Sequence, residues 1–98
     1  MCDLKKVKHS GIHDAELMSI AVDYNKAFLE IQLKTPEGED YKICIEKFCL
    51  FEISHQEPWG KGTYVCSSEI SYDESLDMYL LEIELNSGDK IMIKYVCN

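Results

Sequence analysis

Apolar and polar side chains alternate along most of the chain between residues 17 and 96, and turn residues interrupt the alternation at nearly regular intervals. Successive side chains of a β-strand point to opposite faces, so strict alternation predicts strands with one buried and one solvated face. Turns at 36–38 and 86–89, which contain Pro, Asn and Gly, favour antiparallel hairpins. The pattern therefore predicts an all-β fold, an antiparallel meander of about six strands.

We expect these strands over residues 17–24, 27–35, 41–53, 64–72, 79–85 and 91–95. The alternation fails at Lys47 and Phe48, where a bulge or bend would direct the strand from one sheet layer to another. Both faces of residues 48–53 are apolar, which predicts burial on two sides. A six-stranded meander must curl or split to cover its core, giving a half-barrel or a small sandwich. Near the N-terminus, Asp14 either caps a short helical turn or leads directly into the first strand.

The length of 98 residues suits a single domain, residues 1–98. Ten basic residues, all of them lysine, face eighteen acidic residues, giving a net charge of -8. Phosphate binding requires clustered Lys and Arg, so this charge disfavours nucleic acid and anionic membrane surfaces as partners. A basic protein partner would be attracted, although acidic residues also simply keep small proteins soluble.

The cysteines are odd in number and scattered, which argues against a disulfide framework: Cys2, Cys44, Cys49, Cys66 and Cys97. We expect buried, inert thiols at all of them except Cys2, which we expect to be exposed. The chain shows no secretory apolar segment and no apolar run of about 20 residues. These features predict a cytoplasmic protein.

His9 and His13, followed by Asp14, could bind a metal if this segment were helical, because residues four apart share a helix face. Gly11 weakens such a helix, and only His55 could supply a further histidine. A polar loop is the alternative, and we predict no metal and no cofactor. Nothing in the sequence places His13 or His55 beside a thiol, so we predict no catalytic residues.

The longest irregular stretch, residues 54–63, contains the single tryptophan, Trp59, between Pro58 and Gly60. Loops on a β scaffold commonly carry binding residues, and an exposed Trp is a natural interface anchor. Alternatively, the indole folds back and plugs the open end of the sheet.

Three short motifs occur in order along the chain: Gly-x-His-Asp-Ala at 11–15, Pro-Trp-Gly at 58–60 and Ser-Gly-Asp at 87–89. Their order resembles that in small uncharacterised bacterial all-β proteins, some of which resemble immunity proteins of polymorphic toxin systems. The resemblance covers most of the chain and implies a non-enzymatic protein that neutralises a toxin made by the same cell. An acidic surface would suit a basic nuclease toxin, because charge complementarity speeds the encounter.

Two functions remain open. The first is a protein-binding module without enzymatic activity, such as an immunity protein. The second is a small-molecule-binding module or minor enzyme, whose site lies where two loops converge. Either way, the candidate partner-binding residues are His13, Asp14, His55 and Trp59. A homodimer through an exposed edge strand is a further possibility.

Overall fold

The computed structural model describes residues 12–96, which form seven β-strands and no helix element. The strands are β1 (Glu16–Asp23), β2 (Phe28–Lys34), β3 (Asp40–Glu46), β4 (Phe48–Ile53), β5 (Val65–Asp73), β6 (Met78–Leu85) and β7 (Lys90–Val96). They form two antiparallel sheets, one with the order β1-β2-β3 and one with the order β4-β7-β6-β5. The prediction of an all-β fold is confirmed, with seven strands because the third predicted strand is divided in two.

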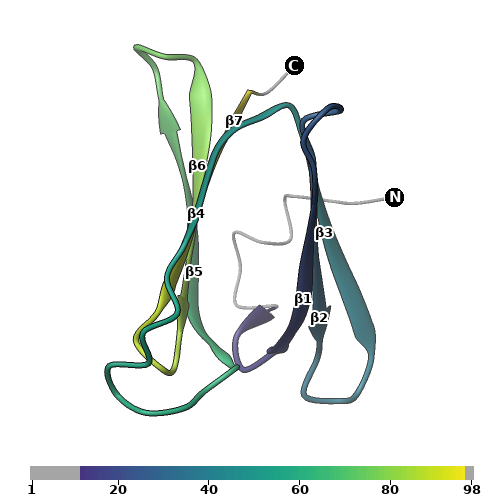
Figure 1. Cartoon of the computed structure of the whole chain (residues 1–98), viewed down its shortest axis with the longest axis vertical. Helices are drawn as coiled ribbons and strands as arrows, with labels where there is room; N and C mark the ends of the chain where they lie inside the picture. Colours follow the sequence, from purple (N-terminus) through teal and green to yellow (C-terminus); the bar gives the residue numbers. More distant parts are fainter. Residues whose placement is uncertain (1–11, 97–98) are drawn as a thin grey trace.

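The two sheets face each other and hold the core between them (Figure 1). Alternation predicts that every second aliphatic side chain of β2, β3, β6 and β7 points inward, and this is confirmed because these side chains are almost fully buried. These side chains are Leu29, Ile31 and Leu33 on β2, Ile43 and Ile45 on β3, Leu81, Ile83 and Leu85 on β6, and Ile91 and Ile93 on β7. Turns of four or five residues connect β1 with β2, β2 with β3, β5 with β6 and β6 with β7, so these pairs are hairpins whose registers place these side chains on one face. β4 pairs with β7, which does not follow it directly in the chain.

The chain changes from one sheet to the other at Lys47, as the loss of alternation predicted. This residue has a positive φ of 60°, which bends the backbone between β3 and β4. The Phe48 N–H donates to Ala27 O at 3.1 Å, and the Val96 N–H donates to Lys47 O at 3.2 Å. The corner at Lys47 is therefore hydrogen-bonded to both sheets. The expectation of two-sided burial for β4 is wrong, because β4 is an edge strand on which Glu52 and Ile53 are exposed.

Replacing Lys47 with glycine should stabilise the fold by about 0.5 kcal/mol. A side chain in the left-handed region costs about 1–2 kcal/mol, and the greater entropy of unfolded glycine offsets part of that gain. The measurement is the urea midpoint of unfolding. The control is Lys42→Gly inside β3, which should destabilise the protein, and a loss of stability in both variants would contradict this account of the corner.

Two β-bulges reverse the alternation where the sequence appeared regular. One lies between Leu17 and Ser19 on β1, and the other between Val65 and Ser67 on β5. Each inserts one residue, so the side chains that precede the bulge lie on the face opposite to the one that alternation predicts, whereas Ile20 and Ile70 after the bulges still pack against the core. Alternation along residues 64–72 predicts inward positions for Tyr64 and Cys66. Both predictions are wrong, because both side chains are exposed and Val65 is buried instead.

The sheets also meet where β1 and β5 begin. The Asp14 N–H donates to Val65 O, the Val65 N–H to Ala15 O and the Leu17 N–H to Thr63 O, all within 2.9 Å. Ala15 is fully buried at this junction. Asp14 has a φ of 67° and follows a single turn, so the chain enters β1 directly and forms no helical turn over residues 15–17.

The cysteines differ from the expectation of buried, inert thiols. Cys49 and Cys66 are free and exposed, and Cys44 is disulfide-bonded. The expectations for Cys2, His9 and Cys97 concern residues outside the described range. Among the described residues, no helix is long and apolar enough to span a bilayer.

Candidate partner-binding site

One buried carboxylate fixes the loop that carries Trp59. Asp89 is the last residue of the turn between β6 and β7, and it is only 2% exposed. Its Oδ1 accepts hydrogen bonds from the Gln56 N–H at 2.7 Å and the Ser54 hydroxyl at 3.0 Å. Its Oδ2 accepts from the Glu57 N–H at 3.0 Å and the Ser87 hydroxyl at 2.8 Å. The carboxylate therefore ties the start of the long loop to a hairpin turn more than 30 residues away in sequence.

These hydrogen bonds determine the ionisation of Asp89. They lower the pKa of its carboxyl from 3.8 to about 2; the bond from the Gln56 N–H contributes most, and desolvation by burial opposes the shift. Donors that bond to the ionised form stabilise it relative to the protonated form. The carboxylate is consequently charged and fully bonded at neutral pH.

Trp59 lies on the same hairpin turn. Its backbone N–H donates to Ser87 O at 3.1 Å. Gly88, with a φ of 93°, lies directly beneath: a Cβ there would be 2.8 Å from Pro58 Cγ and 3.1 Å from Trp59 Cδ2 and Cε3. The indole thus rests on bare backbone and is nevertheless 73% exposed. It does not plug the end of the sandwich, so that alternative is wrong.

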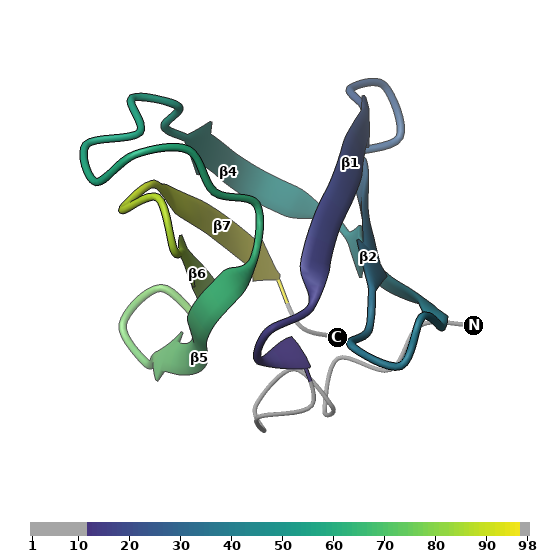
Figure 2. The same cartoon turned by 90° about the horizontal axis from the view of Figure 1, so that it is seen from below.

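The far end of the loop is held by the same turn. The Tyr64 N–H donates to Asn86 Oδ1 at 3.1 Å, and the Asn86 N–H donates to Tyr64 O at 2.9 Å. Figure 2 shows the loop between β4 and β5 passing beside the turn between β6 and β7. We call residues 54–60 together with 86–89 the Trp59 ridge. Hydrogen bonds within this ridge restrict the loop, although its tip faces solvent.

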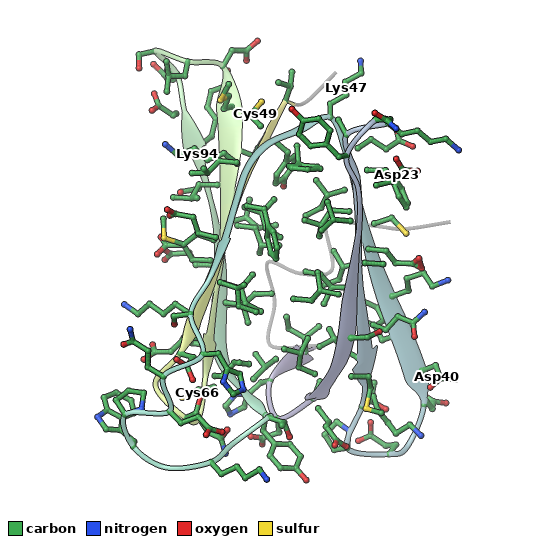
Figure 3. The ribbon with its side chains drawn as sticks, in the orientation of Figure 1. Asp23, Asp40, Lys47, Cys49, Cys66 and Lys94 are labelled. Carbon is green, nitrogen blue, oxygen red and sulfur yellow. The ribbon has the colours of Figure 1, made fainter. Side chains whose placement is uncertain are left out.

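The other predicted site residues do not join Trp59. His13 and Asp14 form an exposed pair, with 3.8 Å between His13 Nε2 and Asp14 Oδ2. His55 is exposed on the loop itself. Within residues 12–96, no hydrogen bond or ion pair links His13 or Asp14 with His55 or Trp59, and no group of three His, Cys, Asp or Glu side chains could hold a metal. The side chains along both sheets are drawn in Figure 3.

The residues that fix the ridge are not apparent as site residues in the sequence. The Ser-Gly-Asp motif at 87–89 indicates a hairpin turn and contributes to the resemblance, but neither this motif nor Ser54 indicates a contact with the long loop. The signal that could have found them is Asp89 itself, because a carboxylate next to a turn glycine is a common partner for backbone N–H groups. Nothing in the local sequence indicates that those N–H groups belong to residues 56 and 57.

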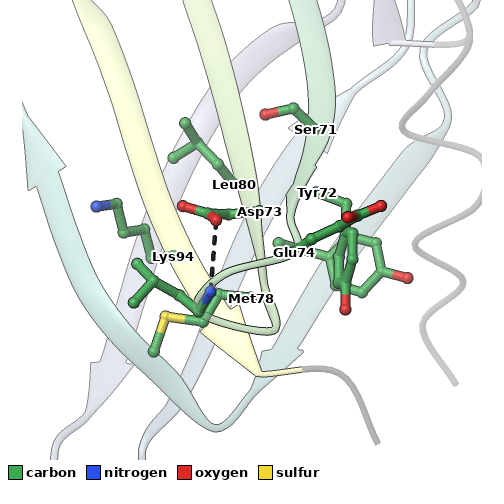
Figure 4. A pocket seen from close by; sticks show the side chains of 9 residues that line it. Ser71, Tyr72, Asp73, Glu74, Met78, Leu80 and Lys94 are labelled. Carbon is green, nitrogen blue, oxygen red and sulfur yellow. Dashed lines mark hydrogen bonds between the residues drawn. The ribbon is translucent and has the colours of Figure 1, made fainter.

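A pocket of about 410 Å³ lies at the other end of the four-stranded sheet, against the β5–β6 hairpin (Figure 4). Its lining combines charged and apolar side chains, among them Asp73, Met78, Leu80 and Lys94. A hydrogen bond from the Ser75 hydroxyl, at 2.6 Å, lowers the pKa of Asp73, and Lys94 adds a smaller electrostatic contribution. None of the four predicted site residues lines this pocket.

An aromatic row crosses the inner face of this sheet near the same end. The ring centroids of Tyr72 and Tyr79 are 5.0 Å apart, and those of Tyr79 and Tyr95 are 5.6 Å apart. These separations are favourable for offset or tilted aromatic pairs. The row connects β5, β6 and β7, and Tyr72 and Tyr79 also line the pocket.

Comparison with known proteins gives no relative: no protein-family model matches the chain, and no curated protein matches it.

Proposed function

We propose that this chain is a non-enzymatic protein-binding module and that the Trp59 ridge is its binding surface. The observation that carries the proposal is an indole that is 73% exposed yet held on a hydrogen-bonded support. An aromatic side chain of this size is the commonest kind of binding hot spot. The exposed indole leaves a large apolar surface in contact with water, and binding a partner would bury that surface favourably.

The support beneath the indole favours partner binding, because it fixes the loop before any partner is bound. Ordering a loop on binding costs free energy, and a loop that is already fixed avoids that cost. Asp89 holds residues 54–57, Gly88 supports Pro58 and Trp59, and Asn86 holds the far end at Tyr64. The ridge is therefore preorganised for a partner with an apolar recess that accepts the indole.

The charge of the chain supports a basic partner. A net charge of -8 increases the encounter rate with a positively charged protein and makes that rate sensitive to salt. The resemblance of the three short motifs to those of immunity-like proteins points in the same direction. We therefore propose a basic toxin of the same cell as the partner, and a cytoplasmic site of action.

The experiment is affinity capture from a lysate of the native host, with wild type, Trp59→Ala and Tyr24→Ala as matched baits. Tyr24 is 86% exposed in the β1–β2 turn and lies outside the ridge, so its variant controls for loss of an exposed aromatic ring. We expect one salt-sensitive basic protein on the wild type and Tyr24→Ala baits. Its affinity for Trp59→Ala should be lower by at least about tenfold.

Equal capture by all three baits would contradict the ridge as the binding surface. Capture of no protein at low salt would contradict the protein-binding function. Thermal unfolding of the three baits provides the necessary control, because removing an exposed side chain should leave their stability within about 0.5 kcal/mol of one another.

A second candidate function is small-molecule binding, and the pocket at the β5–β6 hairpin favours it. Asp73 and Lys94 place opposite charges near Met78 and Leu80, an arrangement suited to a small amphipathic ligand. The test is a ligand screen monitored by the NMR chemical shifts of the whole chain, in which the Met78 methyl group reports on the pocket and the Trp59 indole reports on the ridge. Perturbations that Lys94→Met abolishes would support this function, whereas signals that move only at the Trp59 ridge would exclude the pocket.

A further inference from the structure

The outer edge of β4 is an unprotected strand edge. β4 pairs with β7 on one side, and no other strand in the described part of the chain pairs with its second side. An open edge presents free N–H and C=O groups to any strand that approaches. Proteins usually protect such edges with charged side chains or proline.

The other edge strands carry more charge than β4. β1, β3 and β5 each contain at least two charged residues, whereas β4, with the sequence FCLFEI, contains only Glu52. It has neither lysine nor proline, and its bulge lies at one end, between Phe48 and Leu50. Its exposed residues include Ile53, which is 47% exposed. β4 is thus the edge with the least protection against pairing.

Hydrogen bonds define which part of this edge is open. The Ser54 N–H donates to Lys90 O, and bonding toward β7 alternates along an antiparallel strand. The backbone groups of Leu50 and Glu52 therefore face β7, and those of Phe51 and Ile53 face outward. The Phe48 N–H is already bonded to Ala27 O. The open part runs over residues 49–53, and Phe51 is its centre.

We propose that β4 pairs antiparallel with β4 of a second copy of this chain, with Phe51 opposite Phe51 across the twofold axis. The contact is isologous, so each copy supplies the same five residues. In this register Leu50 lies opposite Glu52 of the second copy, and Cys49 lies opposite Ile53 of the second copy. The two four-stranded sheets become one continuous sheet, and the half-exposed Ile53 side chains are covered.

The neighbouring registers are less favourable. Centring the pair on Glu52 would place two carboxylates directly opposite each other. Centring it on Leu50 would bring the bulge at Cys49 nearer the axis, where it would interrupt the hydrogen bonds to Phe51. The net negative charge does not oppose the contact locally, because the charged residues on and beside this edge are Lys47, Glu52, Lys90 and Lys94.

The experiment is sedimentation equilibrium of the full chain over a concentration series that reaches about 0.1 mM, the range of a weak specific contact. We expect wild type to approach twice the chain mass of 11.3 kDa. A mass of 11.3 kDa throughout the series would overturn the proposal.

Two substitutions at one position test the register. Leu50→Glu places a carboxylate opposite Glu52 of the second copy at two symmetric positions, so the dimer dissociation constant should rise by about tenfold or more. Leu50→Lys places an ammonium group there and should preserve the dimer. Both changes lie on the half-buried outer face opposite Lys94, and circular dichroism checks that both variants fold. Equal dimerisation of the two variants would overturn this register.

Oxidative cross-linking provides a second measurement that does not depend on high affinity. In an Ile53→Cys, Cys66→Ser variant, Cys49 should form a disulfide with the new cysteine of the second copy, because opposed strand residues have Cα separations compatible with this bond. A Glu52→Cys, Cys66→Ser variant, whose new cysteine faces Leu50, is the control. Cross-linking of the control to the same extent would contradict Phe51 as the centre.

Discussion

Replacing Asp89 with alanine should lower the melting temperature by about 10 °C or more at pH 7. The side chain accepts four hydrogen bonds, two of them from the backbone N–H groups of Gln56 and Glu57. Without the carboxylate these donors lose their partner in a half-buried site, and an unsatisfied donor costs more than a lost surface contact. Differential scanning calorimetry measures the change.

A matched control is Asp23→Ala. Asp23 also caps a turn, but it accepts a single hydrogen bond, from the exposed Lys26 N–H at 3.2 Å. Its replacement should lower the melting temperature by much less than that of Asp89. Similar losses in both variants would mean that Asp89 acts only as an ordinary turn cap and does not organise the Trp59 ridge.

The lowered pKa of Asp89 also gives a pH dependence whose sign is fixed. The pKa of this carboxyl is about 2 in the folded protein and near 3.8 when unperturbed, so the folded state binds the proton less readily. Its stabilising contribution is fully present above about pH 4 and is lost as the pH falls through about 2. Asp89→Asn should be less stable than wild type at pH 7, and this difference should shrink between pH 4 and pH 2. A stability difference that stays constant between pH 4 and pH 2 would contradict the lowered pKa of Asp89.

The regular hairpins could be predicted from the sequence because their information is local. The phases of Leu29, Ile31 and Leu33 follow from alternation alone, and the corner at Lys47 follows from its failure. The bulges in β1 and β5 could not be predicted, because the sequence around each inserted residue continues to alternate or is uniformly polar. The resulting error placed Cys66 and Tyr64 on the wrong face.

The candidate site was only partly predictable, for the same physical reason. A single Trp between Pro and Gly in the longest loop indicates a special position. Whether that indole is exposed depends on Gly88 and Asp89, which are about 30 residues away in sequence. His13 and Asp14 were grouped with the loop by residue type, whereas the fold ties Asp14 through its backbone to Val65. Long-range pairing decides which polar residues meet, and the local sequence pattern does not show it.

Gly88→Ala should test whether the support beneath Trp59 matters for both stability and recognition. The φ of 93° is unfavourable for alanine, and its Cβ would lie 2.8 Å from Pro58 Cγ and 3.1 Å from the indole, both shorter than ordinary van der Waals contact. We expect the free energy of unfolding to fall by about 2 kcal/mol. The ring must also move away from the turn, which should change the emission of the single tryptophan.

Gly38→Ala separates the two causes of that loss. Gly38 has nearly the same φ, 89°, in the β2–β3 turn, and a Cβ there would meet nothing within 4 Å. It should therefore show the backbone cost of about 1–2 kcal/mol without any change in Trp59 emission. The extra destabilisation of Gly88→Ala measures the contact with Pro58 and Trp59.

If the ridge binds a partner through a fixed indole, Gly88→Ala should also weaken capture of that partner although Trp59 is still present, and Gly38→Ala should not. Unchanged capture by Gly88→Ala would show that recognition needs the indole but not its support.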